Sequence, residues 1–118
     1  VVVGTSNLVG LPMSLLLLRE GCTVTMCNVN TINLIEETKR AEILVVATGC
    51  RGLITQNHIS ENCIVIDVGI TRVEEGGRKT IKGDVCDDVV CRAKTPVPGG
   101  IGPMTVTMLL SNVVKTLS

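Results

Sequence analysis

Short apolar runs rich in β-branched residues recur along the chain, each with the length of a buried strand. They lie at residues 1–3, 22–26, 42–47 and 63–68. One helix is predicted to pass through residues 15–18 and to end at Glu20, and a second, with Thr31 as its N-cap, to carry Leu34, Ile35 and Thr38. Further segments typical of helices lie at residues 55–59, 88–92 and 103–117. Residues 74–79 are charged and glycine-rich, which predicts a solvent-exposed turn.

Apolar strands that alternate with helices are typical of a parallel sheet whose two faces are both covered. Right-handed crossovers between such strands give a Rossmann-like, doubly wound α/β fold, and 118 residues suffice for one such domain. The four consecutive leucines at residues 15–18 are predicted to belong to its core. Ligands of doubly wound sheets bind beyond the carboxyl ends of the strands, so we expect a site in the loops that follow them.

The composition narrows the classes of partner. Phe, Tyr and Trp are absent, so the core is aliphatic and the chain lacks the aromatic platforms on which nucleic-acid bases stack. Its 11 basic and 11 acidic residues leave no net charge, which argues against a basic surface for nucleic acid or anionic lipid. No apolar run has the length of a transmembrane helix. We therefore expect neither a nucleic-acid nor a membrane partner.

The cysteines and the histidine do not predict a metal site. Six cysteines occur without a Cys-x-x-Cys pair, and His58 is the only histidine. Several cysteines lie in apolar runs, where a free thiol packs as a small hydrophobe, which favours a reducing intracellular compartment. His58 has no evident catalytic partner and is expected to lie at the surface or to cap the short helix around it.

The turn after the first strand carries a candidate dinucleotide site. Gly4, Thr5 and Ser6 follow the strand, and Gly10 opens the helix. Main-chain N–H groups and the positive end of the helix dipole meet there, which suits a pyrophosphate. The spacing departs from Gly-x-Gly-x-x-Gly, and an ordinary strand-to-helix turn capped by Ser6 is an equally good interpretation.

Two further strand ends carry polar residues. Asn28 and Asn30 follow the second strand, where a dinucleotide fold holds the adenosine ribose; they either bind the ribose or only cap the next helix. Asp67 lies near the end of the fourth strand, with Gly69 just beyond it. Asp67 either accepts local backbone hydrogen bonds or contacts a ligand, and Gly69 permits close approach of a planar ring or of another backbone.

The segment from residue 95 to 105, Thr-Pro-Val-Pro-Gly-Gly-Ile-Gly-Pro-Met-Thr, precedes the last helix. Its glycines leave the backbone bare, and Pro103 suits the first helical turn, where a missing N–H costs nothing. The pattern indicates that a flat or anionic ligand lies against the backbone at the start of the helix.

Taken together, four segments resemble the methylenetetrahydrofolate dehydrogenase/methenyltetrahydrofolate cyclohydrolase family. They are residues 4–12, 65–70, 83–85 and 95–105, and their order and spacing match over residues 1–118. The resemblance implies the carboxyl-terminal NAD(P)-binding domain of a bifunctional, homodimeric enzyme, whose folate-binding catalytic domain precedes Val1. It implies oxidation of 5,10-methylenetetrahydrofolate with NAD(P) and hydrolysis of the methenyl product to 10-formyltetrahydrofolate, in the cytoplasm or, alternatively, in a mitochondrion.

The resemblance also assigns roles to residues of this chain. Those matched to the cofactor are Gly4, Thr5, Ser6, Val29, Ile70 and Thr105, and those matched to the folate substrate are Pro98, Gly99, Gly100, Ile101 and Gly102. No catalytic residue is expected within residues 1–118, because the family's catalytic Lys and Tyr belong to the preceding domain.

Three departures from the family pattern bear on the cofactor. Thr5 stands where the family usually has Arg, Asn28-Val29 where it often has His-Ser, and Thr71 where it usually has Asn. The first two remove groups that grip a 2′-phosphate. NADP is the cofactor that the family implies, and NAD is the alternative. The alternative function is a degenerate Rossmann domain with weakened cofactor binding and a structural or dimerising role.

Overall fold

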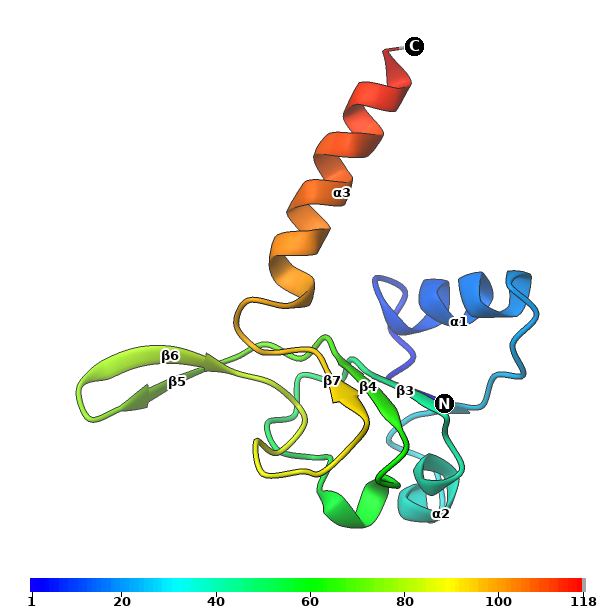
Figure 1. Ribbon diagram of the computed structural model, residues 1–118, viewed down its shortest axis with the longest axis vertical. Coiled ribbons are helices and arrows are strands. Elements are labelled where there is room, and N and C mark those ends of the chain that lie inside the picture. The colour runs from blue at the N-terminus through cyan, green and yellow to red at the C-terminus, as the bar shows by residue number, and fades with distance from the viewer. Residues whose placement is uncertain (118) are drawn as a thin grey trace.

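The central sheet of the domain is parallel and short-stranded. The computed structural model describes residues 1–117, and within them five strands pair in the order β2-β1-β3-β4-β7 (Figure 1). Their bounds are β1 (Val2–Val3), β2 (Met26–Cys27), β3 (Ile43–Val46), β4 (Ile64–Asp67) and β7 (Ala93–Lys94). Val3 pairs with Cys27 and Val46, and Val46 with Asp67, so these carboxyl ends lie level along one edge. The predicted parallel α/β fold is confirmed.

The helical elements are α1 (Gly10–Arg19), α2 (Leu34–Lys39), the 3-10 turn η1 (Gln56–His58) and α3 (Ile101–Thr116). Helices α1 and α2 flank the sheet, whereas α3 projects away from it (Figure 1). Helix α1 connects β1 to β2 on one side of it, and α2 connects β2 to β3 on the other side of β1. Because both crossovers are right-handed, α1 and α2 lie on opposite faces of the sheet. Figure 1 shows α1 on one side of the strands and α2 on the other. The reversal of strand order between β1 and β3 is the topological switch point.

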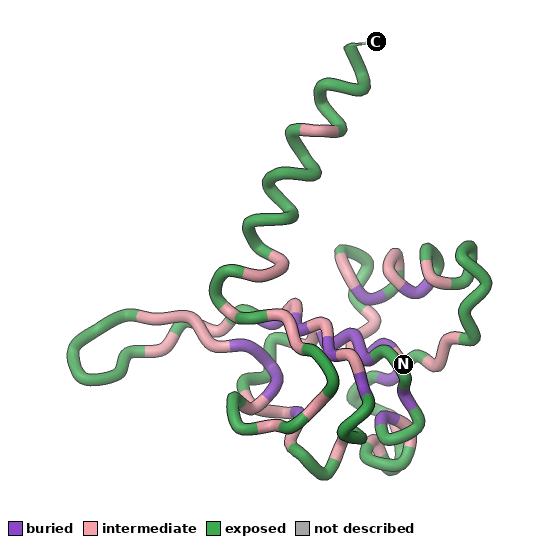
Figure 2. Tube along the Cα trace, viewed as in Figure 1, coloured by how far each residue is buried: buried purple, intermediate pink, exposed green. Residues whose placement is uncertain are grey.

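The core is aliphatic and centred on the strands. Its fully buried side chains include Val2, Leu44, Val46, Ile54 and Val65, all β-branched or leucine. Figure 2 shows the buried positions concentrated along the central strands and the segments beside them. Because the chain has no aromatic residues, closely packed branched aliphatic side chains fill this core instead.

A two-stranded antiparallel hairpin projects from the edge of the domain (Figure 1). It consists of β5 (Thr71–Glu75) and β6 (Arg78–Lys82), joined by Gly76 and Gly77. Both glycines have positive φ, 57° and 78°, which the tight hairpin turn requires. The exposed turn predicted at residues 74–79 is confirmed as its tip, whereas the flanking strands were not predicted.

Three local predictions were wrong, each because a side chain or backbone group has another partner. Residues 88–92 form no helix: the N–H of Val90 donates to Gln56 Oε1 and that of Arg92 to the carbonyl of Cys63. Thr31 does not cap α2, because its Oγ1 accepts from the N–H of Asn28. The second strand spans only Met26–Cys27, and the N–H of Cys22 still donates to the end of α1.

The leucines of α1 were predicted as core and are instead largely at the surface. The exposed fractions of Leu15, Leu16 and Leu18 are 54%, 52% and 52%. Helix α3 projects away from the sheet and has no buried residue (Figures 1 and 2). Within residues 1–117, nothing covers these apolar helix faces.

Candidate functional site

The turn between β1 and α1 folds back tightly because two of its residues are glycine. A Cβ on Gly4, whose φ is +108°, would lie 2.2 Å from the carbonyl oxygen of Ala47. A Cβ on Gly10 would lie 1.8 Å from the carbonyl oxygen of Gly4. Both contacts are far below van der Waals separation, so only glycine lets the start of α1 lie over the end of β1.

Several N–H groups of this turn are available to a ligand. The carbonyl of Ser6 accepts from the N–H of Leu11 at 3.0 Å, and Ser6 Oγ accepts from that of Val9 at 3.4 Å. The N–H groups of Thr5 and Gly10 have no acceptor within residues 1–117. Bare N–H groups at the positive end of a helix suit a pyrophosphate, and the glycine cradle leaves room for one. The long Ser6–Val9 contact makes the alternative, a turn capped by Ser6, weak.

The loop after β2 is a polar turn held by its own residues. Asn28 Oδ1 accepts from the N–H of Asn30 at 2.9 Å, and Thr31 Oγ1 accepts from the N–H of Asn28 at 2.8 Å. Val29 at its tip is 99% exposed. Because β1 and β2 are paired, this loop starts level with Gly4, at the same edge of the sheet. The cofactor role of Val29 stays a prediction.

A second group of predicted residues surrounds one cavity of about 260 Å³. Ile70, Thr105 and all five predicted folate-binding residues line it, namely Pro98, Gly99, Gly100, Ile101 and Gly102. Ile81 from β6 and Val97 add apolar surface to the wall and were not predicted. A Cβ on Gly100 would lie 2.3 Å from the carbonyl oxygen of Pro96, so this glycine permits the tight loop before α3.

Thr105 lies in the first turns of α3, at the rim of this cavity. Its Oγ1 donates to the carbonyl of Ile101 at 2.9 Å, so the hydroxyl proton is used within the helix. The hydroxyl oxygen still has acceptor capacity for a ligand.

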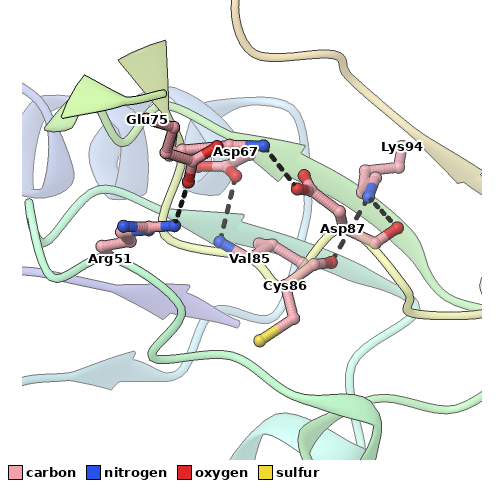
Figure 3. A network of polar contacts seen from close by, with 8 residues as sticks. Arg51, Asp67, Glu75, Val85, Cys86, Asp87 and Lys94 are labelled. Atoms are coloured by element: carbon pink, nitrogen blue, oxygen red, sulfur yellow. Dashed lines mark hydrogen bonds and ion pairs between the residues drawn. The ribbon is translucent and has the colours of Figure 1, made fainter. Parts of the chain in front are cut away.

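Asp67, at the end of β4, holds backbone in place. Its Oδ1 accepts from the N–H groups of Gly69 and Asp84 at 2.9 and 3.1 Å. Its Oδ2 accepts from the N–H of Val85 at 3.1 Å (Figure 3). Burial raises the pKa of this carboxyl, while these backbone donors oppose the rise. The structural interpretation of Asp67 is confirmed, although the residue also borders the cavity.

Asp84 is the principal site residue that the sequence analysis missed. It is fully buried, and its Oδ2 accepts from Thr48 N–H at 2.7 Å, Thr48 Oγ1 at 2.9 Å and Gly49 N–H at 3.1 Å. Its Oδ1 is buried without a hydrogen-bond partner among the residues that the structure describes. A Cβ on Gly69 would lie 2.1 Å from that oxygen and 2.6 Å from the backbone nitrogen of Asp84. Of the two approaches predicted at Gly69, that of another backbone is therefore confirmed, and the Asp84 carboxylate comes with it.

Continuous contacts join the two groups of residues along the carboxyl edge of the sheet. Gly4 packs against the end of β3, the Thr48 turn there is held by Asp84, and Asp84 packs on Gly69 at the cavity wall. A larger cavity of about 490 Å³ lies among Val1, residues 21–25 and residues 40–43, at the amino ends of the strands. We place the candidate site at the carboxyl edge, because doubly wound sheets bind ligands there.

The histidine and the cysteines do not form a further site. His58 Nδ1 accepts from the N–H of Thr55 at 3.1 Å, which confirms the prediction that His58 caps its short helix. All six cysteines are free thiols. Residues 1–117 contain no cluster of three or more side chains suited to a metal ion. In the same residues no helix is long and apolar enough to cross a membrane.

Comparisons with known proteins identify the family of the chain. The model of the family described as tetrahydrofolate dehydrogenase/cyclohydrolase, NAD(P)-binding domain, matches residues 1–118. Bifunctional protein FolD 1 of Rubrobacter xylanophilus is 54% identical over 118 residues, covering 98% of this chain and 40% of that protein. Bifunctional protein FolD of Brevibacillus brevis is 54% identical over 117 residues, covering 97% and 40%. The chain thus spans about two fifths of these relatives.

Solved structures of related enzymes have the same fold. The bifunctional FolD methylenetetrahydrofolate dehydrogenase/cyclohydrolase of Campylobacter jejuni superposes with a TM-score of 0.89 at 44% identity, covering 97% of this chain and 40% of that one. The Trypanosoma brucei enzyme, which is complexed with NADP cofactor and an inhibitor, gives 0.89 at 37% identity, covering 96% and 41%. This chain therefore belongs to the family of NAD(P)-binding domains of tetrahydrofolate dehydrogenase/cyclohydrolase.

Proposed function

We propose that this chain is the cofactor-binding part of an enzyme that oxidises 5,10-methylenetetrahydrofolate and hydrolyses the methenyl product to 10-formyltetrahydrofolate. One observation carries the proposal: the glycine turn at Gly4 and Gly10 and the cavity beside Ile70 lie on one edge of the sheet, joined by continuous contacts. A dinucleotide with its pyrophosphate on the turn extends along that edge toward the cavity. The predicted folate residues line the same cavity, so the two reactants meet there.

The residues of this chain bind and orient rather than react. The N–H groups of the β1–α1 turn hold the pyrophosphate, and the apolar walls of the cavity exclude water from the reacting carbon. When bound, the cofactor supplies the acceptor for the hydride that leaves the folate methylene carbon. The acid–base groups are expected outside residues 1–118, because the matched segments of this chain supply no catalytic Lys or Tyr.

Further structure in the intact protein is part of the proposal. The exposed apolar side chains of α1 and α3 suit a folate-binding domain that packs on this face, and a cleft between the two domains then encloses the cavity. A homodimer and an intracellular location, cytoplasmic or mitochondrial, stay predictions. Six free thiols suit a reducing compartment.

The degenerate alternative lacks support in the turn itself. The N–H groups of Thr5 and Gly10 have no acceptor within residues 1–117, which suits a bound anion better than a purely structural turn. Thr5 and the neutral loop at Val29 concern only the ribose end of the ligand.

The test is a pair of measurements on the intact protein that carries this chain. We expect NAD or NADP to bind with a saturable change in nicotinamide fluorescence of the reduced form. We also expect 5,10-methylenetetrahydrofolate to be converted to the methenyl and then the formyl compound only when the oxidised cofactor is present. Nucleotide binding without conversion of the folate would show that the chain is the cofactor domain of an enzyme with another substrate. The absence of binding to either nucleotide would overturn the proposal.

A further inference from the structure

We propose that the ribose end of the cofactor site selects a 2′-hydroxyl over a 2′-phosphate, so that the cofactor of this protein is NAD rather than NADP. The inference rests on the proposed function and goes beyond it, because that function is satisfied by either nucleotide. It also sets this chain apart from its Trypanosoma brucei relative, whose structure contains NADP. Four observations about the ends of β1 and β2 lead to it.

The fold fixes where the 2′ position lies. In doubly wound dinucleotide-binding sheets the adenosine ribose lies at the carboxyl end of the strand after the first helix, where an acid binds a 2′-hydroxyl or an Arg binds a 2′-phosphate. Here that strand is β2, which ends at Cys27 and is paired with Val3 of β1. The ribose therefore lies between the turn at residues 4–9 and the loop at residues 28–33.

Neither of these two segments contains a lysine or an arginine. Arg19 lies in the last turn of α1, and Lys39 and Arg40 at the end of α2, so all three lie away from the starts of these helices. Arg51 and Lys82 lie at the hairpin side of the domain and are already paired with Glu75 at 3.0 Å and Asp87 at 2.8 Å (Figure 3). Among the described residues 1–117, no lysine or arginine side chain belongs to the two segments at the carboxyl ends of β1 and β2.

The charges nearest to this loop are negative. Glu36 and Glu37 occupy the first turn of α2, directly after the loop. Glu37 is close enough to β2 that its charge, together with the larger effect of burial, raises the pKa of the Cys27 thiol. Asn33 Nδ2 donates to Glu36, and Arg40 pairs with Glu37 at 3.3 Å, which partly neutralises these two carboxylates. A 2′-phosphate adds about two negative charges here and is repelled.

The loop instead presents neutral hydrogen-bonding groups, which suit a hydroxyl. The side-chain amides of Asn28 and Asn30 and the hydroxyl of Thr5 flank the ribose position. Asn28 uses its Oδ1 within the loop, and its Nδ2 has no partner among the residues that the structure describes. A neutral amide binds a hydroxyl without needing a counter-charge, whereas it gives a phosphate dianion no charge-assisted contact.

The inference is tested by nucleotide titration of the intact protein. NADH and NADPH are titrated separately by fluorescence, and adenosine 5′-monophosphate and adenosine 2′,5′-bisphosphate are used as competitors that differ only in the 2′-phosphate. We expect the Kd of NADPH to exceed that of NADH by about tenfold or more. We also expect the bisphosphate to compete no better than the monophosphate.

Two charge variants test whether this loop sets the preference. Val29→Arg adds a cation at a side chain that is 99% exposed, so the fold does not depend on the residue replaced. Glu37→Gln removes the nearby negative charge. We expect each to tighten NADPH more than NADH, and the effect of Val29→Arg to decline at high salt. Asn62→Arg, an equal charge change at an exposed position just before β4, is the matched control and should leave the ratio unchanged.

The outcomes separate this inference from the proposed function. Tighter binding of NADPH than of NADH by the unmodified protein would overturn the inference and leave the proposed function standing. An NADPH to NADH ratio that does not respond to Val29→Arg would also overturn it, because the loop would then not face the 2′ position. Failure to bind either nucleotide would overturn the proposed function and this inference together.

Discussion

One carboxylate oxygen of Asp84 accepts three hydrogen bonds from the Thr48–Gly49 turn, across a sequence separation of up to 36 residues. These hydrogen bonds hold the segment around Asp84, which follows the β5–β6 hairpin, against the turn at the end of β3. The end of β3 in turn packs against Gly4, the first residue of the candidate pyrophosphate turn. A single buried side chain therefore fixes the loop that lies between the two halves of the site.

Asp84→Asn should lower both stability and nucleotide affinity. The amide replaces a carboxylate that receives two N–H groups and a hydroxyl, and loss of a hydrogen bond to a charged group costs about 1.5–3 kcal/mol. We expect a lower free energy of unfolding of about this size in denaturant titrations, together with weaker binding of NAD(P).

Asp87→Asn is the matched control for that measurement. Asp87 is exposed and pairs with Lys82 at 2.8 Å, the kind of surface ion pair whose removal has little effect. If Asp87→Asn lowered the free energy of unfolding as much as Asp84→Asn does, the burial of Asp84 would not explain its contribution to stability.

The β1–α1 turn gives a second prediction. In Gly10→Ala the new Cβ would lie 1.8 Å from the carbonyl oxygen of Gly4, so the turn must open. We expect destabilisation of about 1–3 kcal/mol, typical of overpacking, and loss of nucleotide binding. Unfolding curves and a titration with NADH measure the two effects separately.

Gly102→Ala is the contrasting substitution. Gly102 lies in α3 without positive φ, and no heavy atom lies within 4 Å of its added Cβ. We expect stability to stay unchanged or to rise by up to about 1 kcal/mol, because alanine is the better helix former. Equal destabilisation by the two alanines would contradict the close approach described at Gly10.

The sequence predicted what depends on local pattern and missed what depends on distant partners. Continuous apolar runs predicted the parallel sheet, and the glycine-rich segments predicted both halves of the site. Residues 83–85 contribute to the family resemblance, but the role of Asp84 was missed because composition alone does not distinguish it from Asp87 and Asp88, which are exposed. Its role depends on Thr48, a contact that only the fold creates.

The errors at helix boundaries have the same origin. Thr31 is a residue type that favours the N-cap position, yet its hydroxyl oxygen accepts the N–H of Asn28 within the preceding loop. Residues 88–92 were predicted to form a short helix, but the N–H of Val90 donates to Gln56, which is 34 residues away. The exposure of Leu15 was unpredictable for a different reason, since it depends on what covers α1 rather than on α1 itself.

The surroundings of His58 predict a pH dependence of stability. Burial lowers the pKa of this imidazole below 6.5, and the N–H of Thr55 donates to Nδ1 only when that nitrogen is unprotonated. The folded state therefore binds a proton less readily than the unfolded state does. The free energy of unfolding should fall as the pH drops below about 6.5, until the pH is below the pKa in the folded state.

Unfolding midpoints measured between about pH 5 and 8 test this dependence. His58→Gln keeps a side chain that can cap the helix and removes the titrating group, so the slope in this range should decrease. Because His58 is the only histidine, a slope that persists unchanged in the variant would show that another group is responsible.

Two leucines test where the stability of the domain resides. Leu44 in β3 is fully buried, whereas Leu110 in α3 is 62% exposed. In a protein consisting of residues 1–118, Leu44→Ala should cost about 2–5 kcal/mol. Leu110→Ala should change the free energy of unfolding by no more than about 0.5 kcal/mol. A large loss from Leu110→Ala in this chain would contradict the projecting position of α3. Leu110→Ala can also be made in the intact protein. If the free energy of unfolding then falls strongly there but not in residues 1–118, a further part of the intact protein packs on α3.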